Sequence, residues 1–281
     1  SNKLLYMYLR PQTSKIILFG IFIVTTLNSF SQTSSQTFTS DGTFNVPAGV
    51  TQITVEAWGA GGGGSRVTQN GGGRRGGGGG GGAFASSIIT IAPGTYSVQV
   101  GTGGAFNTDG GISSFNSTTV IADGGKGGVD NSTVAGAGGS IGSSTGTIRH
   151  AGGNGANGGV TFSGGGGGAA GTTGPGTDAS NQTGGNGASL NGGNGANGVS
   201  GSVNGNVGSD YGGGGSGGAT NTNTDRNGGS GANGLVIITW LTPSVTPEIN
   251  TQGGSFPTNI SSGNTAISTV DDTDFGNVDV V

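Results

Sequence analysis

The sequence contains no cysteine and only one histidine, His150, among its 281 residues. Without cysteine the chain has no disulfides, no thiol nucleophile and no thiolate metal site. His150 has no serine or aspartate pattern around it, so we expect a solvated loop histidine and not a catalytic one. Gly-x-Gly-x-x-Gly matches carry no weight in a chain this rich in glycine, and Asp271, Asp272 and Asp274 lack the distal glutamate of an EF-hand loop. The sequence therefore predicts a non-catalytic chain with no cofactor and no bound metal.

Apolar and charged residues are both scarce. Apolar residues make up 30% of the chain and aromatic residues 6%, which predicts a hydrophobic core that is small for this length. Disordered chains are usually poor in apolar residues but rich in charge. Charged residues here are only 8%, and this weakens the case for a disordered chain.

The first 31 residues are predicted to be a secretion signal. Arg10 and Lys15 precede the apolar run 16–27, and small residues at Ser29 and Ser31 fit a cleavage site. The run is too short to span a bilayer, so we expect no membrane span in the mature chain. Met7 is the only methionine and the expected true start. The mature chain is expected to be secreted or held at the cell surface.

Three of the few basic residues, Arg66, Arg74 and Arg75, lie among glycines. Arginine in a glycine-rich context is typical of RNA-binding segments. The formal net charge is −4, however, and loss of residues 1–31 would remove three bases and no acid. An acidic chain is a poor ligand for a polyanion, so the sequence predicts no nucleic-acid partner.

Glycine is abundant: all but seven of the 70 glycines lie between Gly59 and Gly234. Glycine loses more conformational freedom on folding than any other residue, so this block is either a flexible linker or a fold stabilised by backbone packing. Strand-like segments at 52–58 and 235–240 border the block. If these two strands pair, the ends of the block are held together, which lowers the entropy cost of ordering it.

Further strands are predicted on both sides of the first glycine run. Residues 37–39 and 43–46 around the turn Asp41-Gly42 indicate a hairpin. Alternating apolar residues indicate additional strands, at 83–91, 96–100, 113–115 and 119–122. The sequence predicts a mainly β fold, with a small β-sandwich-like scaffold bracketing the glycine-rich insert and few or no α-helices in the mature chain.

Within the glycine block a seven-residue pattern recurs at 152–158, 192–198 and 228–234, and partly at 184–189. When the pattern is divided into triplets, one position is always glycine, the next is glycine or alanine, and the third is asparagine or serine. This period predicts polyglycine-II helices, with three residues per turn and a rise of about 3.1 Å. Such a helix has no internal hydrogen bonds, so neighbours must bond sideways across bare glycine ridges while the asparagine ridges face solvent or a ligand. The predicted structural glycines are Gly152, Gly155, Gly158, Gly192, Gly195, Gly198, Gly228, Gly231 and Gly234.

Other folds use a similar composition. Collagen needs long repeats with abundant proline, and this chain has 7 prolines. Residues 192–200 match a calcium-binding β-roll repeat except that Asn197 replaces the aspartate, and neutral amides make weak calcium sites. A solvated, flexible linker remains open as an alternative.

Four segments together resemble a known family: 38–50, 55–64, 93–101 and 231–240. They are similar to the glycine-rich domain of phage tail-fibre adhesins and of secreted Bacteroidota surface proteins. The resemblance covers roughly 36–240 and implies a β scaffold with a packed bundle of polyglycine-II helices. In the phage adhesins, loops at the tip of the bundle bind host receptors. No tip motif of this chain matches theirs, so the resemblance assigns no receptor-binding residues.

The C-terminal residues differ in composition. We place the glycine-rich domain at 32–240 and a linker at 241–262, where Pro243 and Pro247 lie. Residues 263–281 resemble the start of an immunoglobulin-like repeat common in Bacteroidota surface proteins. The repeat stops after its first strand, which cannot bury a core alone, so the native protein is expected to continue.

These observations predict a secreted, non-catalytic structural or adhesion module that displays loops on a rigid glycine-rich scaffold. The expected partner is a cell-surface polysaccharide or a receptor, and a homo-oligomer is also left open. Two alternatives remain. One is an ice-binding module, since some small antifreeze proteins are polyglycine-II bundles. The other is a flexible glycine-rich spacer of a larger secreted enzyme.

Overall fold

The computed structural model describes residues 32–68, 74–188, 190–242, 249–251 and 260–262. Contacts divide the chain into two units, Ser31–Ser244 and the remaining residues. In the second unit, β12 (Ile249–Thr251) pairs antiparallel with β13 (Ile260–Ser262), within the predicted linker. The predicted signal 1–31 and the predicted repeat start 263–281 lie outside the described residues.

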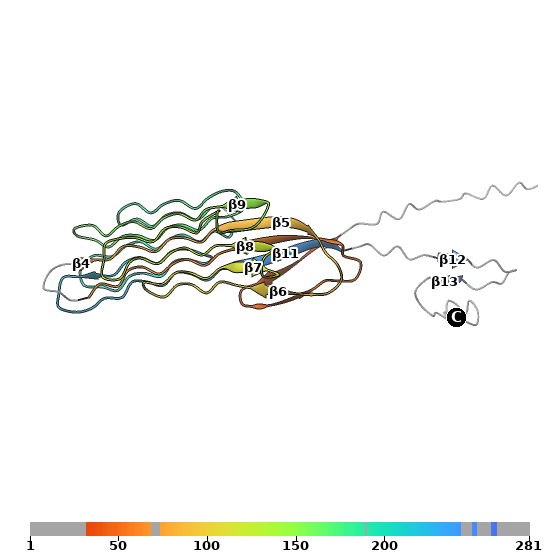
Figure 1. Cartoon of the computed structure of the whole chain (residues 1–281), viewed down its shortest axis with the longest axis horizontal. Coiled ribbons are helices and arrows are strands. Elements are labelled where there is room, and N and C mark those ends of the chain that lie inside the picture. The colour runs from red at the N-terminus through yellow and green to blue at the C-terminus, as the bar shows by residue number, and fades with distance from the viewer. Residues whose placement is uncertain (1–31, 69–73, 189, 243–248, 252–259, 263–281) are drawn as a thin grey trace, which may run out of the picture. The chain divides into compact units, whose positions relative to one another are not determined.

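Two antiparallel sheets form a β-sandwich in the unit Ser31–Ser244 (Figure 1). The first sheet has the order β1-β11-β3-β5-β9, with β1 (Gln32–Phe38), β11 (Leu235–Thr242), β3 (Gln52–Trp58), β5 (Phe84–Thr90) and β9 (Ile148–His150). The second has the order β2-β6-β7-β8, with β2 (Gly42–Asn45), β6 (Thr95–Gln99), β7 (Ser113–Phe115) and β8 (Val120–Ala122). The described residues contain no helix, and the predicted mainly β fold is confirmed.

The core of the sandwich is small, as expected from the low apolar content. Ile53, Val55 and Ala57 alternate along β3 and point into the core, where each is buried. Phe44 and Phe115 of the second sheet pack against these residues. The ring centroids of the two phenylalanines are 6.5 Å apart. β11 lies between β1 and β3, so the predicted strands at the two borders of the glycine block do pair.

The predicted hairpin around Asp41-Gly42 is wrong. β1 pairs with β11 in one sheet, and β2 pairs with β6 in the other. The turn instead carries the chain across the sandwich, so that Phe38 and Phe44 enter the shared core from opposite sheets. Burial of both rings outweighs the local preference for a tight hairpin.

A second buried cluster lies where the sandwich meets the glycine segments. Trp58 and Phe84 pack with ring centroids 4.9 Å apart, beside Leu235 and Ala170. His150 belongs to this region: it lies on β9, is half-buried, and stacks on Phe84 at 6.0 Å. The expectation of a solvated loop histidine is therefore wrong, because β9 pairs with β5 and places His150 opposite Phe84.

The glycine-rich residues run back and forth beside one another from the sandwich to the short pair β4 (Arg74–Arg75) and β10 (Ala219–Thr220) (Figure 1). We call this array the bundle. Its backbone hydrogen bonds connect neighbouring segments, as predicted for helices that cannot bond internally.

Segment 76–83 shows the pattern. Its amides donate in turn, with a period of three, to the segments 212–218, 123–132 and 153–156. Its carbonyls accept, with the same period, from the segments 59–65, 136–139 and 164–170. One threefold helix thus bonds to six neighbours, which is the arrangement of packed polyglycine-II helices.

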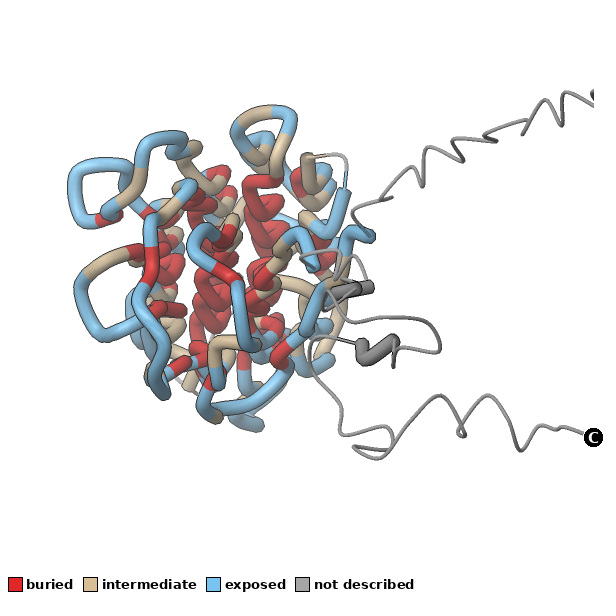
Figure 2. The backbone as a smooth tube through the Cα atoms, turned by 90° about the vertical axis from the view of Figure 1, so that its right-hand side faces the viewer, coloured by how far each residue is buried: buried red, intermediate tan, exposed pale blue. Residues whose placement is uncertain are grey.

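Four segments form the interior of the bundle: 59–65, 76–83, 163–170 and 212–219. Every residue in them is buried, and Figure 2 shows buried backbone gathered in the middle with exposed turns around it. Their side chains are at most a methyl or a serine hydroxyl. The interior is therefore made of peptide groups that satisfy one another, with almost no apolar side chains.

Candidate functional site at the bundle tip

The repeated triplet segments form part of the outer layer of the bundle. Along 152–158 and 192–198, exposure follows the predicted period of three, with each asparagine exposed. The alanines Ala156, Ala196 and Ala232 occupy the buried position, each 7% exposed. One ridge therefore faces the interior and one faces solvent.

Each of the nine triplet glycines lies against another segment so closely that a β-carbon would clash with backbone. Gly152, Gly155 and Gly158 lie on segment 75–82, while Gly195 and Gly198 lie on segment 163–167. Gly228, Gly231 and Gly234 lie on residues 58–64, and Gly192 contacts Ala188 in the outer layer. These glycines pack the bundle, and their positions offer no room for a ligand.

The asparagine ridges have a second role that the sequence analysis missed. Their side-chain oxygens accept hydrogen bonds from backbone amides of adjacent outer segments. The pairs are Asn157 with Ala135 (2.9 Å), Asn154 with Gly138 (3.0 Å), Asn194 with Gly187 (2.8 Å), Asn197 with Gly184 (2.8 Å) and Asn233 with Gly103 (2.8 Å). An outer helix lacks some of its six neighbours, and the amide side chain replaces the missing carbonyl. The spacing of the asparagines at every third residue was the feature of the sequence that could have predicted this role.

The turns at the end of the bundle away from the sandwich form the bundle tip. They comprise residues 66–68, β4, β10 and the turns 129–134, 159–162 and 221–226 (Figure 1). Loops that join rigid segments are the usual place for binding residues. The tip is therefore the part of the bundle where side chains could form a site.

Basic residues concentrate at this tip. Between residues 32 and 244 the chain has six lysines and arginines, and four of them, Arg66, Arg74, Arg75 and Arg226, lie in tip segments. Arg66 forms a two-pronged ion pair with Asp130, at 2.9 Å from Nη2 and 3.1 Å from Nε. The hydrogen bond from Arg66 lowers the pKa of Asp130 below its usual value, and the same bond raises the pKa of Arg66.

Arg75 is buried, with 8% of its surface exposed. Its Nη1 donates to the carbonyl of Thr220 at 2.8 Å, and its Nη2 donates to Asn221 Oδ1 at 2.6 Å. Its Nε is buried without a hydrogen-bond partner. No carboxylate of the described residues forms an ion pair with it. A buried, unpaired guanidinium is costly, and an unsatisfied buried donor calls for an explanation.

Arg74 and Arg75 line a pocket of about 330 Å³, which we call the tip pocket. The other lining residues are Val67, Asn131, Ser132, Thr133, Gly159 and Val160. The lining thus contains two cations, hydroxyl and amide groups, and no carboxylate. Such a lining favours an anion over a cation or an apolar ligand.

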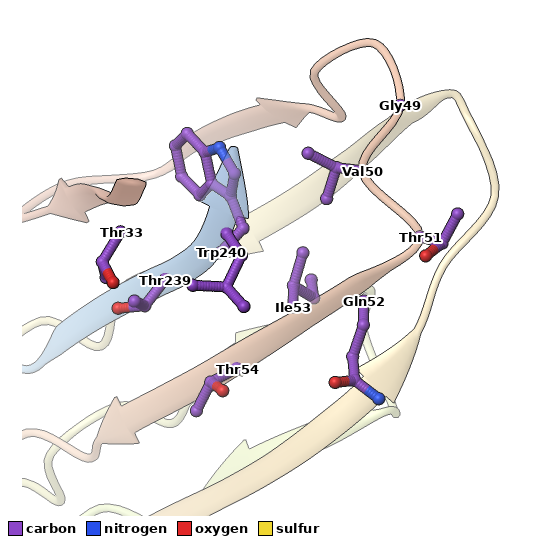
Figure 3. A pocket seen from close by; sticks show the side chains of 10 residues that line it. Thr33, Gly49, Val50, Thr51, Gln52, Ile53, Thr54, Thr239 and Trp240 are labelled. Carbon is purple, nitrogen blue, oxygen red and sulfur yellow. The ribbon is translucent and has the colours of Figure 1, made fainter. Parts of the chain in front are cut away.

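A larger pocket of about 470 Å³ lies at the opposite end, on the sandwich (Figure 3). Val50, Ile53 and Trp240 group between β3, β11 and the turn before β3, and threonines surround them. It contains no charged side chain, so it lacks groups that would orient a polar ligand. Chemically, the tip pocket is the better-defined site.

The structure brings together arginines that the sequence treats separately. Arg66, Arg74 and Arg75 stand out in the sequence only as residues among glycines, and Arg226 does not stand out at all. The fold brings them together, because Val67 pairs with Arg226 and β4 pairs with β10 at the tip. Among the described residues, no cluster of acidic or histidine side chains could hold a metal ion, and no helix is long and apolar enough to cross a membrane.

In a comparison with protein families, residues 33–241 fit the family described as glycine-rich domain. The match covers the sandwich and the whole bundle, including the tip. A comparison with curated proteins finds no match.

Proposed function

Since this chain belongs to the glycine-rich domain family over residues 33–241, we propose that it is a non-catalytic extracellular module for adhesion or surface structure. The bundle is a rigid support, and the tip loops are the surface that it displays. The partner is a polysaccharide or receptor on a cell surface. Export by the signal at 1–31 completes the proposal, with a Bacteroidota surface protein as the setting.

The observation that carries this proposal is the hydrogen bonding of the interior segments. In 59–65, 76–83, 163–170 and 212–219 the backbone groups bond to surrounding segments instead of to water. A spacer needs no such network, because solvated glycine chains satisfy their peptide groups with water. Ordering this block costs conformational entropy, and that cost serves a purpose if the chain must hold the tip in a fixed position.

The ice-binding alternative has less support from the side chains. The outward ridges carry asparagine, and the Oδ1 atoms of five of these asparagines already accept bonds within the bundle. A thermal-hysteresis measurement on the purified chain separates the two functions, and the display proposal expects no hysteresis.

Retention of the purified full chain on whole cells and on arrays of extracellular polysaccharides tests the proposal. We expect retention on at least one surface and its loss on substituting the tip residue Val160, which is 92% exposed, by glutamate. The matched control is Ile141→Glu, since Ile141 is also exposed but precedes β9 at the sandwich end. Absence of retention on every surface, or equal losses for the two variants, contradicts the proposal.

A further inference from the structure

The residues that line the tip pocket include two arginines and no acid. Asp130 is adjacent in sequence to the lining residue Asn131, but both of its carboxylate oxygens already bond to Arg66. Asp130 also accepts a bond from Asn107 Nδ2 at 2.8 Å. Asp130 is therefore held by Arg66 and does not line the pocket, whose lining residues provide no counter-charge to Arg74 and Arg75.

Arg75 is held rigidly. Its Nη1 donates to two backbone carbonyls, those of Thr220 and Arg74, both at 2.8 Å, and its Nη2 donates to Asn221. All of these acceptors are neutral. Neutral acceptors orient a guanidinium but do not cancel its charge, and the cost of burying a charge falls sharply only when an opposite charge approaches.

Arg74 adds a second guanidinium that is only half-buried. Its Nη1 donates to Asn131 Oδ1 at 2.8 Å, and no hydrogen bond of the described residues uses its Nε or Nη2. Guanidinium groups bind carboxylate, phosphate and sulfate through parallel N–H···O pairs. The free edge of Arg74 is a donor of this kind, and the buried charge of the adjacent Arg75 adds to the attraction for an anion.

The geometry points to an oxyanion-binding site in the tip pocket, where Arg74 binds the acidic group of a cell-surface glycan and the buried Arg75 adds positive charge. The ligand group is a carboxylate, as in a uronic acid, or a phosphate on a sugar. A pocket of about 330 Å³ holds one sugar-sized group. Asn131, Ser132 and Thr133 provide polar groups for neighbouring hydroxyls. This inference rests on the proposed function, since it names the chemical class that the displayed tip recognises.

Titration of the full chain with glucuronate, inorganic phosphate and glucose tests the site, with the Nε–H signals of arginines followed by NMR. We expect saturable shifts of the Arg74 signal with glucuronate or phosphate and none with glucose. A response to glucuronate alone identifies a carboxylate ligand, and a response to phosphate alone identifies a glycan phosphate. If neither anion shifts the signal, the site is disproved without the use of any variant.

Two charge-matched variants separate the pocket from general electrostatics. Arg74→Gln is expected to weaken anion binding by about tenfold or more, the loss of one charge-assisted pair. Arg149→Gln removes the same charge from β9 at the sandwich end and is expected to leave affinity unchanged. Arg74→Lys keeps the charge and removes the planar fork, so it should also weaken binding. Equal effects of Arg74→Gln and Arg149→Gln overturn the inference.

The two proposals can fail separately. If the chain is retained on cells but Arg74→Gln is retained equally and glucuronate and phosphate do not compete, the oxyanion site is wrong and the display function stands. If the pocket binds the anions but the chain is retained on no surface, the site stands and the display function is wrong.

Discussion

At the scale of single residues, the bundle depends on what a position lacks. Gly155 lies against the carbonyls of Gly78 and Gly79, and a β-carbon at this position would clash with both carbonyl oxygens. Asn154, the preceding residue, points outward and is exposed. Two adjacent residues of one helix therefore differ completely in the side chains they tolerate.

We predict that Gly155→Val destabilises the bundle by about 3 kcal/mol, the upper range for overpacking a close-packed interior. Asn154→Val should cost about 1 kcal/mol, because the amide of Gly138 loses its acceptor. Chemical unfolding of the two variants measures the difference. Equal effects contradict the assignment of a bare and a polar ridge.

The asparagine bonds allow a second comparison. Asn197 accepts from the amide of Gly184, whereas the exposed Asn186 takes part in hydrogen bonds only through its backbone and accepts none at its side chain. Asn197→Ala should therefore cost about 1 kcal/mol, while Asn186→Ala should change the free energy of unfolding by less than about 0.5 kcal/mol. Calorimetry of both variants checks this. If Asn197→Ala leaves the free energy of unfolding unchanged, the hydrogen bond from Gly184 to Asn197 does not stabilise the bundle.

At the scale of elements, β3 connects the sandwich core with the bundle, since its last residue, Trp58, directly precedes the interior segment 59–65. Its outward face carries Glu56, which pairs across the sheet with Ile237 of β11 and Ser86 of β5. Burial raises the pKa of Glu56 above its ordinary value. The folded state thus holds this proton more tightly than the unfolded chain does.

The sign of the pH effect follows from linkage. Between the ordinary pKa of 4.5 and the raised folded value, the folded state binds more protons, so stability falls as the pH rises through this window. We predict that Glu56→Gln stabilises the protein at pH 7 and has a smaller effect at pH 4, measured by thermal unfolding. A Glu56→Gln effect of the same size at both pH values contradicts the prediction.

At the scale of the whole unit Ser31–Ser244, stability is divided between two kinds of interior. The sandwich buries apolar side chains, and the bundle buries peptide groups. The Trp58 cluster and the pairing of β11 with β3 connect the two. Because each interior helix depends on all its neighbours, we expect the bundle to open as a unit and not helix by helix.

Amide hydrogen exchange followed by NMR measures this cooperativity. We predict that glycines in 76–83 and 163–170 exchange only through global opening, at least about a thousandfold slower than amides of the exposed turn 141–143, consistent with a global stability of several kcal/mol. The turn residues serve as the internal control. Rapid exchange of the interior glycines would show a flexible spacer and contradict the rigid bundle.

The sequence by itself determined the mainly β class, the strands around the glycine block, and the threefold period that makes polyglycine-II helices. These follow from local properties: the alternation of Ile53, Val55 and Ala57, and the spacing of glycine and asparagine in 152–158. It could not show that Phe38 and Phe44 lie in opposite sheets, since a turn sequence does not record which strands its flanks will pair with.

Only the tertiary structure decided which glycine runs lie inside the bundle and which arginines meet at its tip. The four interior segments carry no triplet asparagines, so no local feature of the sequence shows that they, and not the repeated segments, are interior. Their burial depends on having six neighbours. The same folding brings Arg74 and Arg75 beside 131–133 and 159–160. A site built from turns far apart in the chain depends on how the helices are packed, which is a property of the assembled bundle and not of any segment.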